Sequence, residues 1–418
     1  MNKISLLIGK TVFAVLKLFG RRGAALPGLV VEKLDSNFLS SMLSKLPNGV
    51  IIVVGTNGKT TTTKMLSHVL RSKYRVLTNP TGSNFTRGIV ASIVEHSSWG
   101  GSLPFDIAVL ELDEAYAVKF VDLHKPRGAV VLNVMRDQMD RFAEIDQTAK
   151  LLAKVAKAST EFVVLNADDS RIDAIGHDIN TGLYKFGVSA NLRATFLQDD
   201  ELHGDANKVA SKDLTVCLLS YKAGWATFKI KSSEFAVELS SLGAHNALNA
   251  AAVLAICQAL DFDIKDAVGR LSEVKPAFGR GELFVIDGNK KVYLQLVKNP
   301  GGFRHSLLSA ESQNTALAMI AINDDYPDGR DVSWLWDVNF SSLHNGKIIT
   351  SGVRAADMAL RLKYDNIVVD DINEDLNASL LNFVAKLSNS KSGTIFATYT
   401  AMLELRQHIA KITEVEQV

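Results

Sequence analysis

A glycine-containing turn has the residue types of a phosphate-binding loop. The apolar run Val50–Val54 is followed by a short polar segment, which consists of Gly55, Thr56, Asn57, Gly58, Lys59, Thr60 and Thr61. In such a loop the backbone N–H groups point at phosphate, the lysine supplies a cation, and the hydroxyl after the lysine can bind Mg²⁺. The usual eight-residue P-loop would have glycine at position 53, where this chain has Val53. The sequence therefore predicts a nucleoside triphosphate site of the shorter GTNGKTTT form, with Lys59 exposed on the loop.

A second polar cluster follows the apolar run Ile107–Leu110. It contains Glu111, Asp113 and Glu114. A carboxylate at the carboxyl edge of a parallel sheet lies near bound phosphates and can hold magnesium. We therefore expect Thr60 and Glu111 to bind Mg²⁺, whereas Asp113 and Glu114 are either further ligands or solvated loop charges.

The elements around these residues alternate between apolar runs and helical patterns. This alternation over the first part of the chain predicts an α/β domain with a parallel sheet and crossover helices. Residues 191–241 have a strand-rich texture typical of an antiparallel insertion. A second alternating series includes the run Ile367–Val369 and predicts a Rossmann-like α/β domain. The predicted parts are a helical segment 1–45, an ATP-binding central domain 46–281 and a C-terminal domain 282–418.

Charge and cysteine content restrict the function. The 418 residues include 46 basic and 45 acidic side chains, so the basic excess typical of a nucleic-acid-binding protein is absent. The two cysteines, Cys217 and Cys257, cannot form a four-thiolate zinc site or a disulfide framework. Neither sequence context is that of a reactive nucleophile. We expect a cytoplasmic protein without structural zinc.

The N-terminal segment has apolar residues at helical spacing. Ile4, Ile8, Val12, Val15 and Phe19 predict an amphipathic helix. Its apolar face can pack on the protein itself, on a partner or on a membrane surface, and the pattern alone leaves these alternatives open.

The GTNGKTTT loop and the cluster at Glu111 resemble the Mur ligases and folylpolyglutamate synthases. These enzymes use ATP to convert a carboxylate into an acyl phosphate that an amine then attacks. Most Mur ligases have a magnesium-binding histidine where this chain has Gln138, and they begin with a nucleotide-sugar domain for which the residues before the loop are too few. These departures favour the branch of MurT-type synthetase subunits. The matches to that branch are Leu26-Pro27-Gly28, Arg136 to Arg141, Asn166 to Asp169, Phe278 to Glu282, Leu296 to Pro300, Asp331 to Asp337, Ser351 to Arg354 and Thr398 to Met402.

The resemblance implies roles for residues outside the loop. Asn246 and Asn249 match a segment near the adenine, although Asn246 could instead cap a helix. Arg280 would bind a phosphate between the domains or form a surface ion pair. Lys298 and Asn299 would bind the carboxylate substrate. Asp331 and Asp337 would contribute to the catalytic centre near the entry of ammonia, or act as a helix cap and a surface charge.

The activity implied by the resemblance is ATP-dependent amidation of the D-glutamate α-carboxylate in the lipid II stem peptide, giving D-isoglutamine. Ammonia would come from a GatD-type class I glutamine amidotransferase subunit in a heterodimer. Lipid II would be met at the inner face of the membrane, where the protein would be peripheral. The alternatives are a stand-alone ligase that adds an amino acid, and a nucleotide-binding scaffold without catalysis. Many members of the branch carry a zinc ribbon of two cysteine pairs, which the single cysteine in the corresponding region cannot form.

Overall fold

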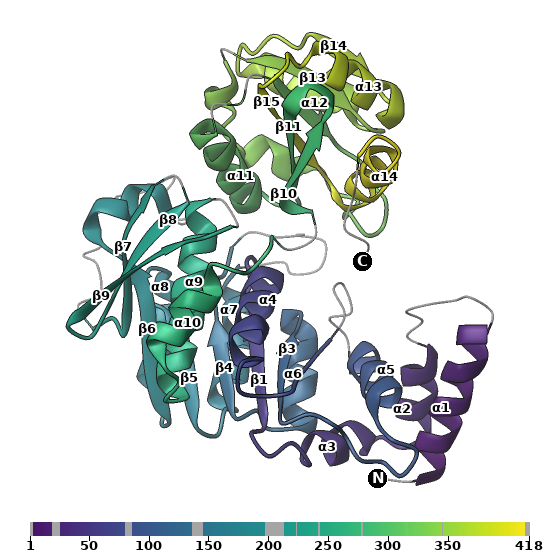
Figure 1. Cartoon of the computed structure of the whole chain (residues 1–418), viewed down its shortest axis with the longest axis vertical. Helices are drawn as coiled ribbons and strands as arrows, with labels where there is room; N and C mark the ends of the chain where they lie inside the picture. The colour runs from purple at the N-terminus through teal and green to yellow at the C-terminus, as the bar shows by residue number, and fades with distance from the viewer. Residues whose placement is uncertain are drawn as a thin grey trace.

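The computed structural model describes residues 3–18, 26–79, 86–135, 145–196, 213–222, 224–240, 243–276, 279–313, 315, 317–344 and 346–413. The Arg136 to Arg141 motif, and with it Gln138, lies outside the described residues, as do Phe19 and Phe278. The described chain forms two separate sheets with helices on both faces of each (Figure 1).

The first sheet has the strand order β2-β3-β1-β4-β5-β6-β7-β8-β9 over the described residues. Its first seven strands pair in parallel, and β7, β8 and β9 pair antiparallel, as the sequence predicts. β1, β3, β4 and β5 are buried along their whole length, which explains their continuous apolar runs. The strands are β1 (Val50–Val54), β2 (Val76–Thr78), β3 (Ile107–Glu111), β4 (Gly128–Val131), β5 (Phe162–Asn166), β6 (Gly182–Val188), β7 (Val216–Lys222), β8 (Trp225–Ile230) and β9 (Ser233–Glu238).

Two hydrophobic cores lie on opposite faces of this sheet. One contains apolar residues of α4, α9 and α10, and the other contains those of α3, α5, α6, α7 and α8. The helix α9 is buried along most of its length. The helices of this part are α1 (Lys3–Leu18), α2 (Leu26–Leu34), α3 (Phe38–Leu43), α4 (Lys59–Leu70), α5 (Thr86–His96), α6 (Glu114–Leu123), α7 (Ile145–Lys157), α8 (Ser170–Ile175), α9 (Ala244–Ala259) and α10 (Ile264–Leu271).

The second sheet has the order β10-β11-β15-β12-β13-β14, with only the β10–β11 pair antiparallel among the described strands. The expected strand Ile367–Val369 is wrong: Val368 is 80% exposed, and the edge strand forms at Asp371–Asn373. The strands are β10 (Arg280–Ile286), β11 (Lys290–Leu296), β12 (Leu317–Ala321), β13 (Lys347–Ser351), β14 (Asp371–Asn373) and β15 (Ser392–Ala397). The helices are α11 (Pro300–Ser312), α12 (Ala355–Tyr364), α13 (Leu376–Lys386) and α14 (Tyr399–Ile409).

The helices α1, α2 and α5 form a stack at the edge of the first sheet. In Figure 1 α1 is the outermost of the three, on the side of the molecule away from the second sheet. No helix among the described residues is both long and apolar enough to cross a bilayer.

Candidate active site

The loop after β1 needs glycine at two positions. Gly55 and Gly58 have φ angles of +132° and +86°, which side-chain-bearing residues rarely adopt. A Cβ atom at position 55 would press on the backbone of Asn133, and one at position 58 would collide with the carboxamide of Asn249. The helix α4 then begins at Lys59. The loop therefore lies tightly between β4 and α9, with the N-terminus of a helix directly behind it.

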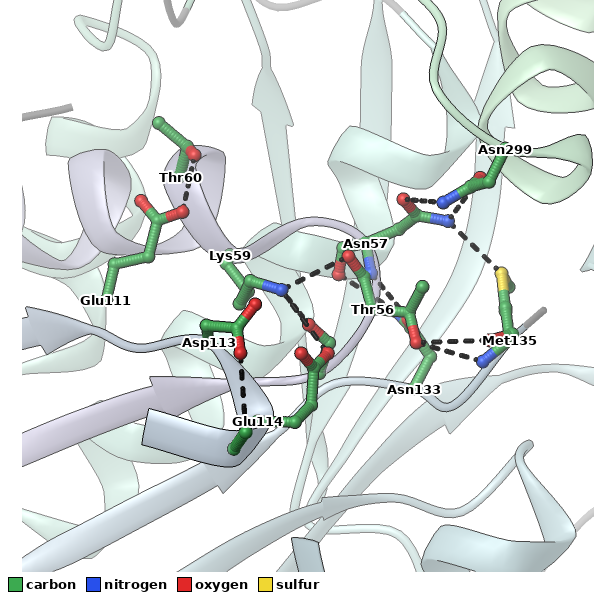
Figure 2. A network of polar contacts seen from close by, with 12 residues as sticks. Thr56, Asn57, Lys59, Thr60, Glu111, Asp113, Glu114, Asn133, Met135 and Asn299 are labelled. Carbon is green, nitrogen blue, oxygen red and sulfur yellow. Dashed lines mark hydrogen bonds and ion pairs between the residues drawn. The ribbon is translucent and has the colours of Figure 1, made fainter. Parts of the chain in front are cut away.

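Lys59 is buried, which corrects the expectation that it is exposed. Only 7% of the residue is accessible, and its Nζ donates to the carbonyl oxygens of Gly55 and Thr56. It also forms an ion pair with Glu114, at 3.4 Å from Oε1, and Glu114 is itself 5% exposed (Figure 2). The reason is that α6 starts at Glu114, the last residue of the cluster that follows β3, and holds this side chain beneath the loop.

Thr60 and Glu111 are brought together at the carboxyl ends of β1 and β3. Thr60 Oγ1 donates to Glu111 Oε1 at 2.8 Å (Figure 2). Asn79 holds the Glu111 backbone from both sides, since its Nδ2 donates to the Glu111 carbonyl and its Oδ1 accepts from the Glu111 N–H, each at 2.9 Å. A hydroxyl and a carboxylate are the oxygen donors that Mg²⁺ prefers. The residues present therefore fit the magnesium site that the sequence predicts.

The other two acids of the cluster have structural contacts. Asp113 is the N-cap of α6, where its side chain accepts from the N–H of Ala115 at 3.3 Å. Glu114 pairs with Lys59, as described above. Asp113 is half-buried and Glu114 is buried, so neither acid is a solvated loop charge, which was one of the two alternatives from the sequence.

Asn133, directly after β4, holds the loop in place. Its Oδ1 accepts from the N–H of Asn57 at 2.8 Å, and its Nδ2 donates to the Asn57 carbonyl at 3.0 Å. Thr56 Oγ1 accepts from the N–H of Met135 at 3.0 Å. These contacts are absent from the sequence prediction; the signal that points to Asn133 is its position after a strand that neighbours β1.

Asn57 and Asn299 join the loop to the second sheet's domain. Each side-chain amide donates to the other's oxygen, both at 3.1 Å (Figure 2). Asn299 is 1% exposed, and its Oδ1 also accepts from the N–H of Gly302 as the N-cap of α11. The structure thus places the predicted substrate residue Asn299 at a contact between the domains.

A cleft of about 900 Å³ opens beside this contact. Its walls include Asn249, Arg280 and Lys298, which the sequence assigns to nucleotide or substrate, whereas Asn246 is one helical turn away and does not line it. Burial lowers the pKa of the Arg280 guanidinium, and the negative charge of Glu111 opposes this effect. The cleft lies between the phosphate loop and β11, so it adjoins the loop on one side and the second domain on the other.

Two histidines that the sequence did not single out as a pair also line the cleft. His245 comes from α9 and His305 from α11, with ring centroids 5.4 Å apart. Burial lowers the pKa of His245 to about 3 and that of His305 to about 4. Both imidazoles are therefore neutral at pH 7 and can act as hydrogen-bond donors or acceptors.

The aspartates Asp331 and Asp337 lie away from this cleft. Asp331 is exposed and accepts from the N–H of Ser333 at 2.8 Å, at the start of the 3₁₀ turn Ser333–Asp337. Asp337 is exposed and lines a second hollow of about 1,320 Å³ together with Arg304 and Met135. Met135 also lines the first cleft, so the two hollows adjoin.

Comparison with known proteins agrees with this geometry. The family described as Mur ligase middle domain matches residues 53–257, and the family described as MurT ligase C-terminal matches residues 296–402. A lipid II isoglutaminyl synthase (glutamine-hydrolyzing) subunit MurT of Streptococcus pneumoniae is 31% identical over 97% of this chain and 96% of its own length. The chain belongs to the MurT family of Mur ligases. A relative of the same name from Staphylococcus aureus is 27% identical, with 94% of each chain covered. Each relative is named as a subunit, so its enzyme comprises at least one further chain.

The fold is that of the Mur ligases. The MurF ligase of Thermotoga maritima, solved in complex with ADP, superposes with a TM-score of 0.71 at 17% identity, covering 90% of this chain and 83% of that one. The Escherichia coli protein FolC, in complex with DHPP and ADP, gives a TM-score of 0.63 at 13% identity, covering 90% and 92%. The expected P-loop central domain and α/β C-terminal part are therefore confirmed as a fold class.

Proposed function

We propose that the chain is the synthetase subunit of a lipid II isoglutaminyl synthase. It would use ATP to activate the D-glutamate α-carboxylate of the lipid II stem peptide as an acyl phosphate, which ammonia converts to D-isoglutamine. The observation that carries the proposal is the Thr60–Glu111 pair beside the glycine loop, in a chain that belongs to the MurT family.

The loop residues supply the phosphate contacts. The N–H groups around Gly58 and the N-terminus of α4 present partial positive charge to an anion. The Lys59 ammonium lies directly beneath the loop, where it is paired with Glu114, and would be the loop's cation for the phosphates. Thr60 and Glu111 would hold Mg²⁺, which when bound neutralises charge on the phosphate oxygens.

The cleft would hold the rest of the nucleotide and the reacting carboxylate. Asn249 adjoins the loop and would contact the nucleotide, with Asn246 supporting it from the next turn of α9. Arg280 and Lys298 are cations that face the cleft and would stabilise the phosphoryl group and the carboxylate during transfer. Asn299 would fix the position of Lys298 by holding the two domains together.

We also propose that the chain is divided at the limits that the sequence predicts, with parts 1–45, 46–281 and 282–418.

Ammonia would come from a partner subunit. Burial raises the pKa of the Cys257 thiol to about 12, and burial also raises the pKa of half-buried Cys217, so neither thiol ionises readily for nucleophilic attack. Ammonium lacks the lone pair needed for attack, so ammonia released beside the acyl phosphate and shielded from water is the useful form. We propose a GatD-type class I glutamine amidotransferase as the source.

The partner would dock largely on the C-terminal domain. An aromatic and apolar group is exposed there: Trp336 and Tyr364 have ring centroids 5.2 Å apart and are 52% and 69% exposed, and Leu360 on the same helix as Tyr364 is 50% exposed. Exposed aromatic clusters of this kind are typical of protein–protein contacts. Asp337 lies in the adjoining 3₁₀ turn and lines the second hollow, where ammonia would arrive; Asp331 precedes the same turn.

Amidation with different nitrogen sources tests this function. The chain, alone and with the candidate amidotransferase, is supplied with lipid II, ATP and either glutamine or ammonium chloride, and D-isoglutamine is measured by mass spectrometry. We expect glutamine-dependent product only with the partner, and slower ammonium-dependent product from the chain alone. Efficient use of glutamine by the isolated chain, or addition of an amino acid in place of ammonia, would instead indicate a stand-alone ligase.

The paired variants Asp331→Asn and Asp337→Asn refine the assignment, because Asp337 ends the 3₁₀ turn and lines the second hollow, whereas Asp331 precedes the turn and lines neither of the two hollows described above. We expect Asp337→Asn to lower the rate by at least tenfold and Asp331→Asn to act mainly through stability of the turn. Equal rates for both variants and the parent would exclude a catalytic role for either carboxylate.

Two further properties belong to this proposal. We propose a cytoplasmic, peripheral location at the inner face of the membrane, where the lipid-linked substrate is accessible. We also propose that the chain holds no structural zinc, because a zinc ribbon needs four thiolates and the sequence has Cys217 and Cys257 alone. Elemental analysis that found one zinc per chain would contradict this.

A further inference from the structure

The N-terminal helix α1 presents an apolar face to solvent. Leu18 is 86% exposed, Ile4 65%, Leu7 53% and Val15 45%. At 100° per residue these four positions span about 80° of the helix circumference, so they form one face. We call these four residues the α1 face. The apolar periodicity in the sequence is therefore directed largely outward, and not into the protein core.

The opposite side of α1 fixes this orientation. Leu6 is 1% exposed and belongs to the core that lies under α5. A Cβ atom at Gly9 would collide with Val31 of α2, so the two helices approach closely at this glycine. Rotating α1 to bury the α1 face would move Leu6 into water and a larger residue into the Gly9 contact. The outward direction of the face is therefore set by packing.

Positive charge flanks the α1 face. The helix contains Lys3, Lys10 and Lys17 and no Asp or Glu, whereas the whole chain carries a net charge of only +1. At 100° per residue these lysine positions fall on one side of the face. The basic character of α1 is thus local, and it adjoins apolar surface.

An exposed tryptophan from another segment extends the same surface. Trp99, three residues after α5, is 65% exposed, and the Lys10 ammonium lies 5.6 Å from the centre of its ring. Tryptophan favours the boundary between water and lipid because its ring is apolar and its N–H can remain hydrogen-bonded. Its place beside Lys10 is independent of the helical pattern of α1.

We propose that the α1 face, with Lys10, Lys17 and Trp99, binds the surface of a membrane that contains anionic lipids. An amphipathic helix with apolar residues on one face and lysines at its border inserts its apolar side among the acyl chains and pairs its cations with the headgroups. The helix has 16 residues, about 24 Å, so it is shorter than the ~30 Å hydrocarbon core and lies along the surface. An antiparallel second copy of the chain fits less well, because apolar pairing of two α1 faces in this orientation would bring the like-charged lysine borders together.

The consequence for activity rests on the proposed function. Docking through α1 would keep the chain at the surface where a lipid-linked peptide is found, and it would leave both hollows uncovered by α1, because no residue of this helix lines either of them. The binding itself depends only on α1 and Trp99, so it can be tested without substrate or nucleotide.

The experiment is sedimentation of the full chain, alone and with its partner subunit, with vesicles of phosphatidylcholine or of phosphatidylcholine and phosphatidylglycerol. We expect binding to the anionic vesicles that weakens with added salt. The double variant Leu7→Glu/Val15→Glu should lower the partition coefficient at least tenfold, and Lys10→Gln/Lys17→Gln should remove most of the preference for anionic lipid. The matched control Val368→Glu changes an 80% exposed residue far from α1 and should bind as the parent does.

Circular dichroism and thermal unfolding establish that the variants are folded. Equal vesicle binding by the parent and Leu7→Glu/Val15→Glu, or no binding by the parent, would overturn the proposal. A concentration-dependent dimer that this variant abolishes would show that a second copy covers the face. Because these measurements omit lipid II and ATP, their failure leaves the amidation assay unaffected, and failure of that assay leaves the membrane contact intact.

Discussion

The buried Lys59–Glu114 pair predicts that Lys59→Ala both inactivates and destabilises the protein. The two side chains are 9% and 7% exposed, with 3.4 Å between Nζ and Oε1. Removing one partner leaves the other charge buried, which costs about 3–5 kcal/mol. Because the ion pair is longer than an ideal hydrogen bond, we take the lower limit. We expect Lys59→Ala to reduce the free energy of unfolding by about 3 kcal/mol, and not to leave it unchanged as an exposed loop lysine would.

A second substitution separates the charge effect from the loss of the lysine stem. In Lys59→Ala/Glu114→Gln the remaining side chain is neutral and needs no cation, so at least about half of the lost stability should return. Phosphate binding still lacks its lysine, so the double variant should stay inactive. The matched control is Lys150→Ala, an exposed lysine on α7, for which we expect a change within about 0.5 kcal/mol.

Urea unfolding followed by circular dichroism, in the absence of nucleotide, measures these differences, and the slopes test whether one transition describes the chain. If Lys59→Ala unfolded at the same urea concentration as the parent and Lys150→Ala, the pair would contribute nothing and the burial described here would be wrong. If the double variant were no more stable than Lys59→Ala, the unpaired Glu114 charge would not be the source of the loss, and the hydrogen bonds to Gly55 and Thr56, which both variants lack, would account for it.

Three further predictions follow from the cleft and the loop. Asn57→Ala and Asn299→Ala should show a coupling of about 1–2 kcal/mol in a double-mutant cycle of unfolding free energies, because each single change breaks the same two amide hydrogen bonds. His245 and His305 have folded pKa values of about 3 and about 4, below the unfolded value of 6.5, so their contribution to stability is complete above pH 6.5 and is lost as the pH falls through these two values. Unfolding at a series of pH values should show this decline, and His245→Gln/His305→Gln should reduce it. Gly58→Ala should lower nucleotide affinity at least tenfold in calorimetry, because position 58 has φ +86° and adjoins Asn249.

Controls and contrary outcomes differ among the three. Gly269→Ala is the control for Gly58→Ala, because a Cβ atom there meets no neighbour and the residue is in a helix. Additive losses in the asparagine cycle would show that the two side chains act independently. A pH dependence that is identical in the histidine variant and the parent would assign the acid sensitivity to other groups.

The sequence alone determined the local architecture of the site. The apolar run Val50–Val54, the two glycines and the start of a helix after Gly58 are local features, since chain periodicity and backbone sterics act over a few residues. The proximity of Thr60 and Glu111 also followed from sequence, because the carboxyl ends of neighbouring parallel strands meet at one edge. In the structure these two side chains are 2.8 Å apart.

Contacts across long separations were decided by the tertiary structure. Asn57 and Asn299 are 242 residues apart, and nothing in either local segment indicates that their amides pair. The burial of Lys59 depends on where α6 begins, and the strand at Asp371–Asn373 forms there because edge pairing with β13 outweighs the apolar run before it.

The direction of the α1 face is a further tertiary result. Its periodicity predicts an amphipathic helix but not which side faces water, because both sides of α1 carry apolar residues. The close approach at Gly9 and the burial of Leu6 decide the orientation. Sequence periodicity thus specifies which residues share a face, whereas the packing of neighbouring helices specifies where that face points.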